Sequence, residues 1–302
     1  GGLTVQITLP WAARAIRQSR APAAIRRLAA SLGAEGAIGL ALLVAFAIVG
    51  ISAPLLAPYD PAAFSGAPLE RPSADHRLGT NDVGQDILSE LIAGARISLA
   101  VALGAAGGTV LLAVLIGGAA GYAGGWIDAA LMRVVDVLMA LPQLPLLILI
   151  TALLGAGLGQ MVLVFAALFW PGTARIIRAQ VLSLRRRGYV AQARGFGAGP
   201  VYILRRHILP AIGPLIVFGL VTAAARAVVF EAGLAFLGLG DPTAKSWGLM
   251  MRYALNLPGL LLSDRWLWWL LPPGLCVTVL ILALNLLGIG LEHRLDPRLK
   301  RP

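Results

Sequence analysis

Residues 189–210 read YVAQARGFGAGPVYILRRHILP and lie between two long apolar runs. Three glycines at 195, 197 and 199 interrupt the stretch, and Pro200 follows them. Proline is favoured in the first turn of a helix and disfavoured in its interior. The stretch therefore predicts a short helix, a glycine-rich break, and a second helix that begins at Pro200 and ends before Pro210.

The composition around this stretch is that of a membrane protein. The 302 residues are 58% hydrophobic and 13% charged, with a mean hydropathy of +0.82. A soluble domain carries about 25% charged residues, so the chain is too apolar for that class. The single cysteine, Cys276, lies in an apolar run and is interpreted as a small buried hydrophobic residue.

Six segments are apolar and long enough to cross a bilayer core of roughly 30 Å as helices. A tight turn, GAGLGQ, separates the third from the fourth. The sequence thus predicts an all-α membrane protein with six transmembrane helices. They are expected near residues 37–57, 97–121, 132–154, 158–177, 211–236 and 267–290.

Arginine placement orients the predicted spans. Residues 175–208 carry eight arginines and no acid, and residues 1–36 carry five arginines and one acid. Positive charge gathers on the cytoplasmic side, so the N- and C-termini and the 178–208 loop are expected there. The acid-rich residues 58–95 are expected outside. The predicted regions are a basic tail at 1–36 that could form an interfacial helix, an anchor at 37–57, an external loop at 58–95, a transmembrane core at 96–291 and a tail at 292–302.

The sequence carries no recognised catalytic or metal-binding pattern. It has no His-Glu-x-x-His zinc motif, no Gly-x-Ser-x-Gly elbow and no phosphate-binding loop of the G-x-x-x-x-G-K-[ST] type. We therefore expect no catalytic, cofactor-binding or metal-binding residue in this chain. The arginines lie at the edges of apolar runs, which favours membrane topology over nucleic-acid binding.

Ionisable residues inside the predicted spans are unusual, since each costs about 2.5 to 3.5 kcal/mol at the bilayer centre. Arg226 and Glu231 lie in the fifth span, five residues apart. Each could line a water-filled path or pair with another helix. Arg133 and Asp136 are three residues apart, which favours a local ion pair.

Glycines recur four residues apart in and just after the second predicted span, at 104 and 108, at 117 and 121, and at 121 and 125. Such spacing lets two helices approach closely. It fits packing within the chain and a dimerisation face equally well.

The opening stretch resembles the "EAA" loop of ABC importer permeases, which forms the coupling helix that docks on the ATPase. Gly197 matches the fixed glycine, Ala193 the last alanine, and RHILP at 206–210 the end of the motif. Ala191 stands where the motif often has glutamate. The resemblance implies a coupling site formed by Tyr189, Ala191, Ala193, Gly195, Gly197, Arg205, His207 and Pro210.

Four further stretches are similar to the C-type permease of the dipeptide/oligopeptide/nickel family. They are HRLGTNDVGQDILSELIAGARISL (76–99), GYAGGWIDAALMRVVDVLMALP (121–142), EAGLAFLGLGDPTAKSWGLMM (231–251) and NLLGIGLEHRLDPRLK (285–300). The resemblance covers residues 37–300. It implies the type I ABC importer permease fold and a multi-pass protein of the bacterial inner membrane.

The resemblance also implies the partners of an ATP-driven importer for peptides or related solutes. These are a homologous B-type permease, two ATPase subunits that bind ATP and Mg, and an extracytoplasmic substrate-binding protein. The alternative is a stand-alone ion-coupled carrier or channel. That class favours several ionisable groups near the bilayer midplane and an internal repeat, and the sequence has only Arg226 and Glu231 and no clear repeat.

Overall fold

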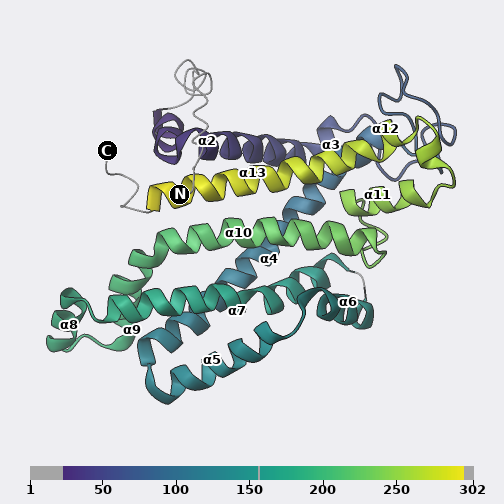
Figure 1. Ribbon diagram of the computed structural model, residues 1–302. Helices are drawn as coiled ribbons and strands as arrows, with labels where there is room; N and C mark the ends of the chain where they lie inside the picture. The colour runs from purple at the N-terminus through teal and green to yellow at the C-terminus, as the bar shows by residue number, and fades with distance from the viewer. Residues whose placement is uncertain (1–22, 156, 296–302) are drawn as a thin grey trace, which may run out of the picture.

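The computed structural model describes residues 23–155 and 157–295, and its long helices run roughly along one axis (Figure 1). The predicted tail at 1–36 and the tail at 292–302 fall mostly outside these residues. The helices are α2 (Ala23–Ile51), α3 (Ala53–Leu56), α4 (Ile87–Ala123), α5 (Gly125–Ala140), α6 (Gln143–Leu154), α7 (Leu158–Arg185), α8 (Gly188–Gly195), α9 (Pro200–Ile203), the π-helical turn η1 (Leu204–Ile208), α10 (Leu209–Phe236), α11 (Trp247–Asn256), the 3-10 turn η2 (Leu260–Leu262), α12 (Trp266–Trp269) and α13 (Leu271–Leu295).

The helices provide the predicted membrane spans. Five are long and apolar enough to cross a bilayer, and the bent pair α5 and α6 makes a sixth if it counts as one span. The all-α membrane fold is therefore confirmed. α4 has 37 residues, which is about 55 Å of helix at 1.5 Å per residue. It is longer than the bilayer core, and it begins at Ile87, ten residues before the predicted second span.

The predicted third span at 132–154 corresponds to two helices, α5 and α6, with a sharp bend between them. α5 and α6 meet at an 89° bend. Leu141 is extended, with ψ 135°, because the ring of Pro142 disfavours helical backbone in the residue before it. Helix therefore stops at Ala140 and restarts at Gln143. The proline places an elbow where the hydropathy showed one continuous run.

The α4 glycines pack against α7 within the chain. A Cβ on Gly108 would lie 2.6 Å from Cβ of Ala166, and one on Gly121 would lie 2.7 Å from the carbonyl oxygen of Arg178. A Cβ on Gly117 would overlap the Ala174 carbonyl oxygen. The absence of side chains lets the two backbones approach closely. Of the two interpretations of the spacing, packing within the chain holds for these glycines.

Glycines also allow a close contact between the first and last spans, α2 and α13. Gly36 of α2 and Gly290 of α13 face each other, and a Cβ on Gly290 would lie 2.5 Å from Cα of Gly36. A Cβ on Gly39 would lie 2.5 Å from the carbonyl oxygen of Ala283. α2 therefore packs lengthwise on α13, as Figure 1 shows.

The bundle has two distinct ends. The start of α2 and the end of α13 lie at the same end as α8 and α9, whereas α3, α6, α11 and α12 lie at the other (Figure 1). We call these the α8–α9 end and the α11–α12 end. This arrangement requires an even number of crossings between α2 and α13.

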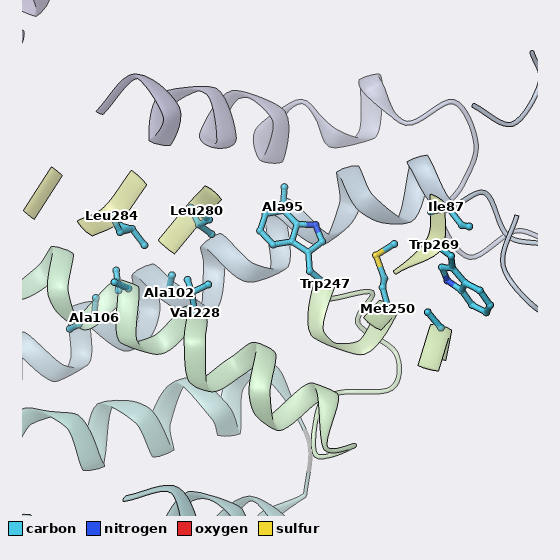
Figure 2. Close-up of a cluster of buried hydrophobic side chains, with 14 of the residues drawn as sticks. Ile87, Ala95, Ala102, Ala106, Val228, Trp247, Met250, Trp269, Leu280 and Leu284 are labelled. Atoms are coloured by element: carbon cyan, nitrogen blue, oxygen red, sulfur yellow. The ribbon is translucent and has the colours of Figure 1, made fainter. Parts of the chain in front are cut away.

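Buried side chains fix the α11–α12 end to the spans. Trp247 of α11 and Trp269 of α12 are each 1% exposed and pack in one cluster with Ala95 of α4 and Leu280 of α13 (Figure 2). The indole nitrogen of Trp247 also donates a 2.9 Å hydrogen bond to the carbonyl oxygen of Leu91. α11, α12 and α13 are therefore held in fixed positions against α4.

Candidate coupling surface and open helix face

The protrusion at the α8–α9 end is built from α8, a tight turn, α9 and η1. α8 ends in a Schellman motif, in which Ala198 N donates to Ala193 O and Gly197 N donates to Arg194 O, each at 3.0 Å. Gly197 has φ +83°, a left-handed conformation that costs glycine little. The predicted helix, glycine break and restart at Pro200 are confirmed.

The predicted end of the second helix before Pro210 was wrong. Helix continues from Pro200 to Phe236. Pro210 has no N–H to give to the preceding turn, and the π-helical turn at Leu204–Ile208 widens the helix just before it. The protrusion is therefore joined to the fifth span by uninterrupted helix.

Three apolar residues anchor the protrusion to α7. Val190, Ile203 and Ile208 are fully buried, in one cluster with Val181 and Leu184 of α7. α7 itself extends to Arg185, so the first residues of the predicted 178–208 loop are helical. The anchor and the continuous helix together make the protrusion a rigid extension of α7 and α10.

The tip of the protrusion exposes large apolar side chains. Phe196 is 91% exposed, Val201 67% and Tyr202 55%. The ring of His207 packs between Tyr189 and Tyr202, with centroid distances of 6.0 and 5.8 Å. An exposed apolar patch on a basic surface is typical of a protein contact.

The structure places the predicted coupling residues around this tip, and sequence reasoning missed three neighbours. Phe196, Val201 and Tyr202 were not among the predicted site residues. The signal for Phe196 was an aromatic residue directly before a helix-ending glycine in a polar segment. The predicted residues Ala191, Gly195, Gly197, Arg205, Tyr189 and Pro210 are exposed, and Ala193 and His207 are half-buried.

Arginines of α7 hold α5 in place. Arg178 binds Asp128 through two nitrogens, with Nη2 to Oδ2 at 2.6 Å. Arg175 contacts Asp136 at 2.5 Å. The expected local pair between Arg133 and Asp136 is thus replaced by a contact between helices, because the packing of α5 on α7 brings Arg175 within reach. Part of the arginine cluster is therefore structural.

Arg226 of α10 lies at the elbow between α5 and α6. Its guanidinium donates a hydrogen bond to Oε1 of Gln143, the first residue of α6. It also lies 4.6 Å above the ring centroid of Phe169 and 5.9 Å from that of Phe230. Among the described residues, no carboxylate lies within 4.0 Å of it. The positive charge is held by an amide and two aromatic rings.

Glu231 faces a different way. It is 2% exposed, among α10 residues packed on α11, where a Cβ on Gly248 would lie 2.5 Å from the carbonyl oxygen of Ala232. Its Oε2 has no hydrogen-bond partner among the described residues. The structure does not pair Arg226 with Glu231, and only Arg226 reaches an open face.

That open face runs along α10 and α13. On α13 the exposed residues Thr278, Asn285 and Glu292 recur every seven residues and so share one side of the helix. Near the α8–α9 end the face is hollowed into a cavity of about 780 Å³. Its lining includes Gln180 of α7, Phe218 of α10 and Glu292.

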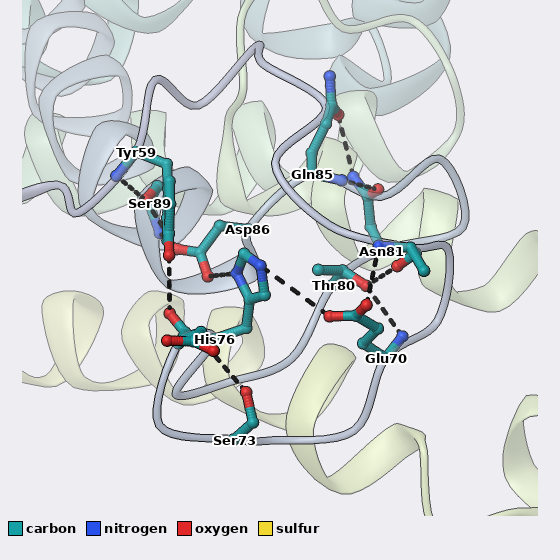
Figure 3. Close-up of polar contacts among 11 residues, drawn as sticks. Tyr59, Glu70, Ser73, His76, Thr80, Asn81, Gln85, Asp86 and Ser89 are labelled. Atoms are coloured by element: carbon teal, nitrogen blue, oxygen red, sulfur yellow. Dashed lines mark hydrogen bonds and ion pairs between the residues drawn. The ribbon is translucent and has the colours of Figure 1, made fainter.

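Residues 57–86 form a folded segment at the α11–α12 end, which we call the cap (Figure 1), and Figure 3 shows its polar contacts. His76 is 4% exposed, and its Nδ1 lies 2.9 Å from Oδ1 of Asp86. Asp86 also caps α4 by accepting a 2.8 Å hydrogen bond from the Ser89 backbone. The predicted external loop at 58–95 therefore ends at Asp86, where the cap is fixed to the first turn of α4.

A second contact ties the cap to the segment before α11. Lys245 Nζ lies 2.8 Å from Oε1 of Glu90 and donates to Oε1 of Gln85 at 2.6 Å. Nearby, the hydroxyl of Thr243 donates to Asp241 at 2.6 Å and lowers the pKa of that carboxyl. Sequence reasoning did not single out these residues, because Glu90 and Lys245 are 155 positions apart.

Comparisons with known proteins agree with this architecture. Residues 113–301 match the family described as binding-protein-dependent transport system inner membrane component. The chain is 39% identical over 265 residues to the dipeptide transport system permease protein DppC of Bacillus subtilis, covering 87% of this chain and 82% of the relative. It is 38% identical to a Brucella suis protein whose name includes "peptide permease protein", with 86% of each chain covered.

Proposed function

Since the chain belongs to the family of binding-protein-dependent transport system inner membrane components, we propose that it forms half of the pathway of a peptide importer and couples to ATPases through residues 188–208. It is a permease subunit of an ABC transporter in a bacterial inner membrane, and works with ATPase and substrate-binding partners. The coupling surface, the composition of the complex and the solute are what we propose.

The exposed tip of the protrusion is the observation that carries the coupling role. Phe196, Val201 and Tyr202 form an apolar patch that water disfavours, next to the exposed Arg194 and Arg205. A partner with an apolar cleft and an acidic rim would bury the apolar patch and form ion pairs with the two arginines. The ATPase subunit is that partner in our proposal.

The rigidity of the protrusion supports a mechanical role. ATP binding draws the two ATPase subunits together. Each ATPase subunit then displaces the permease protrusion that is docked on it. Because Val190 and Ile203 are packed on α7 and helix runs unbroken into α10, the displacement passes to both spans. The pathway then switches between outward and inward access. A permease without this coupling could only equilibrate its solute.

The proposed complex contains this chain, a homologous B-type permease, two ATPases that bind ATP and Mg, and an extracytoplasmic binding protein. The α8–α9 end faces the cytoplasm, in agreement with the eight arginines and no acids of residues 175–208. The α11–α12 end and its cap face the binding protein. Peptides are the proposed solutes, because the named relatives carry dipeptide and peptide permease in their names.

The coupling role is tested by Phe196→Asp. Burying a carboxylate in an apolar contact is costly, so this variant should lose co-purification of the ATPase subunits and ATP-driven uptake. Leu262→Asp is the matched control for co-purification, because Leu262 is 94% exposed in η2, between α11 and α12. Loss of the ATPases from both variants, or from neither, would contradict docking at the tip. Uphill uptake by the chain alone in liposomes would favour the carrier alternative.

A further inference from the structure

The exposed residues of α10 form one continuous stripe along the helix. Ala211, Leu215, Phe218, Thr222, Arg226, Val229, Gly233 and Phe236 follow each other at intervals of three or four residues, and each is exposed or half-buried. The lower part of this stripe lines the cavity between α7 and α10. Arg226 therefore lies on the same helix face as the cavity, two turns beyond Phe218.

Arg226 is also deep in the span. It precedes Phe236, the last residue of α10, by ten residues, which corresponds to about 15 Å of helix. Lipid headgroups lie at the ends of a span, so they do not neutralise a charge at this depth. A cation in such a place carries a large solvation cost and marks a functional site by default.

The contacts of Arg226 orient the guanidinium without neutralising it. Gln143 accepts one N–H, and Phe169 and Phe230 lie against the group. A guanidinium has five N–H donors in a planar fork that matches a carboxylate. One bond to an amide leaves donors and a full positive charge for a ligand. An acid within the chain would have satisfied both, and none of the described carboxylates lies within 4.0 Å.

We propose that Arg226 binds the carboxylate of the solute as it passes between outward and inward access. This inference rests on the proposed pathway and adds to it the chemical group that the chain recognises. Thr222 lies one turn nearer the cavity on the same face, and its hydroxyl donates to the carbonyl oxygens of Phe218 and Gly219 within α10. The solute class is a molecule with a free carboxylate, such as a peptide with an unmodified C-terminus.

A merely structural role for Arg226 makes a different prediction. If its function were to hold the elbow through Gln143, the Gln143→Ala variant would behave like the loss of Arg226 itself. If its charge attracts anions, Gln143→Ala would leave that attraction in place, and so would Arg226→Lys. Both variants therefore belong in the experiment.

The experiment measures charge selectivity at Thr222→Cys in the assembled complex, with Cys276→Ser as background. Labelling of this chain by an anionic methanethiosulfonate (sulfonate, MTSES) is compared with labelling by a cationic one (trimethylammonium, MTSET), and followed by mass spectrometry. A fixed cation in a cleft raises local anion concentration by about tenfold or more. We expect an anion preference of that order, lost in Arg226→Gln and retained in Arg226→Lys and Gln143→Ala.

A competition arm identifies the carboxylate. Dialanine should slow the anionic reagent at Thr222→Cys, and dialanine amide should not. Leu111→Cys, on an exposed face of α4, is the control and should show no preference that depends on residue 226. An unchanged anion preference in Arg226→Gln, or equal competition by the amide, would overturn the inference and leave the pathway standing. Failure of both reagents to react at Thr222→Cys in every nucleotide state would overturn the pathway as well.

Discussion

Gly197 sets the direction of the protrusion through one backbone angle. With φ at +83°, it reverses the chain after α8 and lets Ala198 N close the Schellman motif on Ala193 O. Apart from its two neighbours in the chain, no described residue has an atom within 4 Å of the position that a Cβ would occupy. The glycine is thus required by backbone conformation and not by lack of space.

Substitution of Gly197 should separate shape from bulk. A left-handed conformation costs a residue other than glycine about 1 to 2 kcal/mol, and more when the side chain is β-branched, as in valine. Gly197→Val should therefore distort the turn and reduce ATP-driven uptake severalfold. Asn tolerates the same angle, so Gly197→Asn should retain most uptake although it is larger than alanine. Equal loss of uptake by the two variants would show that bulk, not backbone angle, matters here.

The spacing of charged residues in the sequence was a poor guide to which side chains contact each other. Asp136 lies within reach of Arg133 on its own helix, yet it binds Arg175 of α7. Arg226 and Glu231 are close in sequence, yet one faces the elbow of α5 and α6 and the other is buried against α11. Neighbouring helices decided each outcome, and a single sequence does not say which helices are neighbours.

At the scale of elements, α4 and α7 form the central contact of the bundle. The α4 glycines at 104, 108, 117 and 121 meet α7 at Val162, Ala166, Ala174 and Arg178. The glycines of α4, which lack side chains, therefore let α7 pack closely along α4. Hydropathy predicted both helices, and the glycine spacing predicted that α4 has a close neighbour without identifying it.

Two adjacent glycines of α4 offer a matched test of this contact. A Cβ at Gly117 would overlap the Ala174 carbonyl oxygen, whereas one at Gly118 would have no atom of another described element within 4 Å. Overpacking costs about 1 to 3 kcal/mol, and replacing a helical glycine by alanine gains about 0.5 to 1 kcal/mol. Gly117→Ala should lower the apparent Tm of the complex in detergent, and Gly118→Ala should leave it equal or higher. Equal Tm values for the two variants would contradict the close approach.

At the scale of the whole molecule, the cap and the bundle form one body. Asp86 joins them, because its carboxylate accepts a hydrogen bond from the backbone N–H of Ser89 in α4 and contacts the buried ring of His76. Lys245, in the segment before α11, adds a link by donating a 2.6 Å hydrogen bond to Oε1 of Gln85 in the cap. The surface that we propose for the binding protein is therefore fixed to the start of α4 by side-chain contacts.

Removal of the Asp86 side chain should loosen this joint. Asp86→Ala loses a helix cap, worth about 0.5 to 2 kcal/mol, and leaves a buried ring nitrogen of His76 without its partner, which costs about 1 to 3 kcal/mol more. The expected result is a Tm several degrees lower and faster proteolysis within residues 57–86. Asp82→Ala is the control, because Asp82 is exposed. Protease resistance unchanged in Asp86→Ala would show that other contacts hold the cap.

The sequence by itself determined the class of fold and the place of the protrusion. Apolar runs of about 20 residues require helices, since a bilayer leaves backbone polar groups no other partners, and Gly197 and Pro200 fix local backbone angles that need no distant contact. Only the tertiary structure decided which helices touch, that the α5 and α6 elbow meets Arg226, and that residues as distant as Glu90 and Lys245 pair. Those outcomes depend on packing between segments far apart in the chain. The apolar helices have similar hydropathy, so hydropathy alone does not say which helix packs against which.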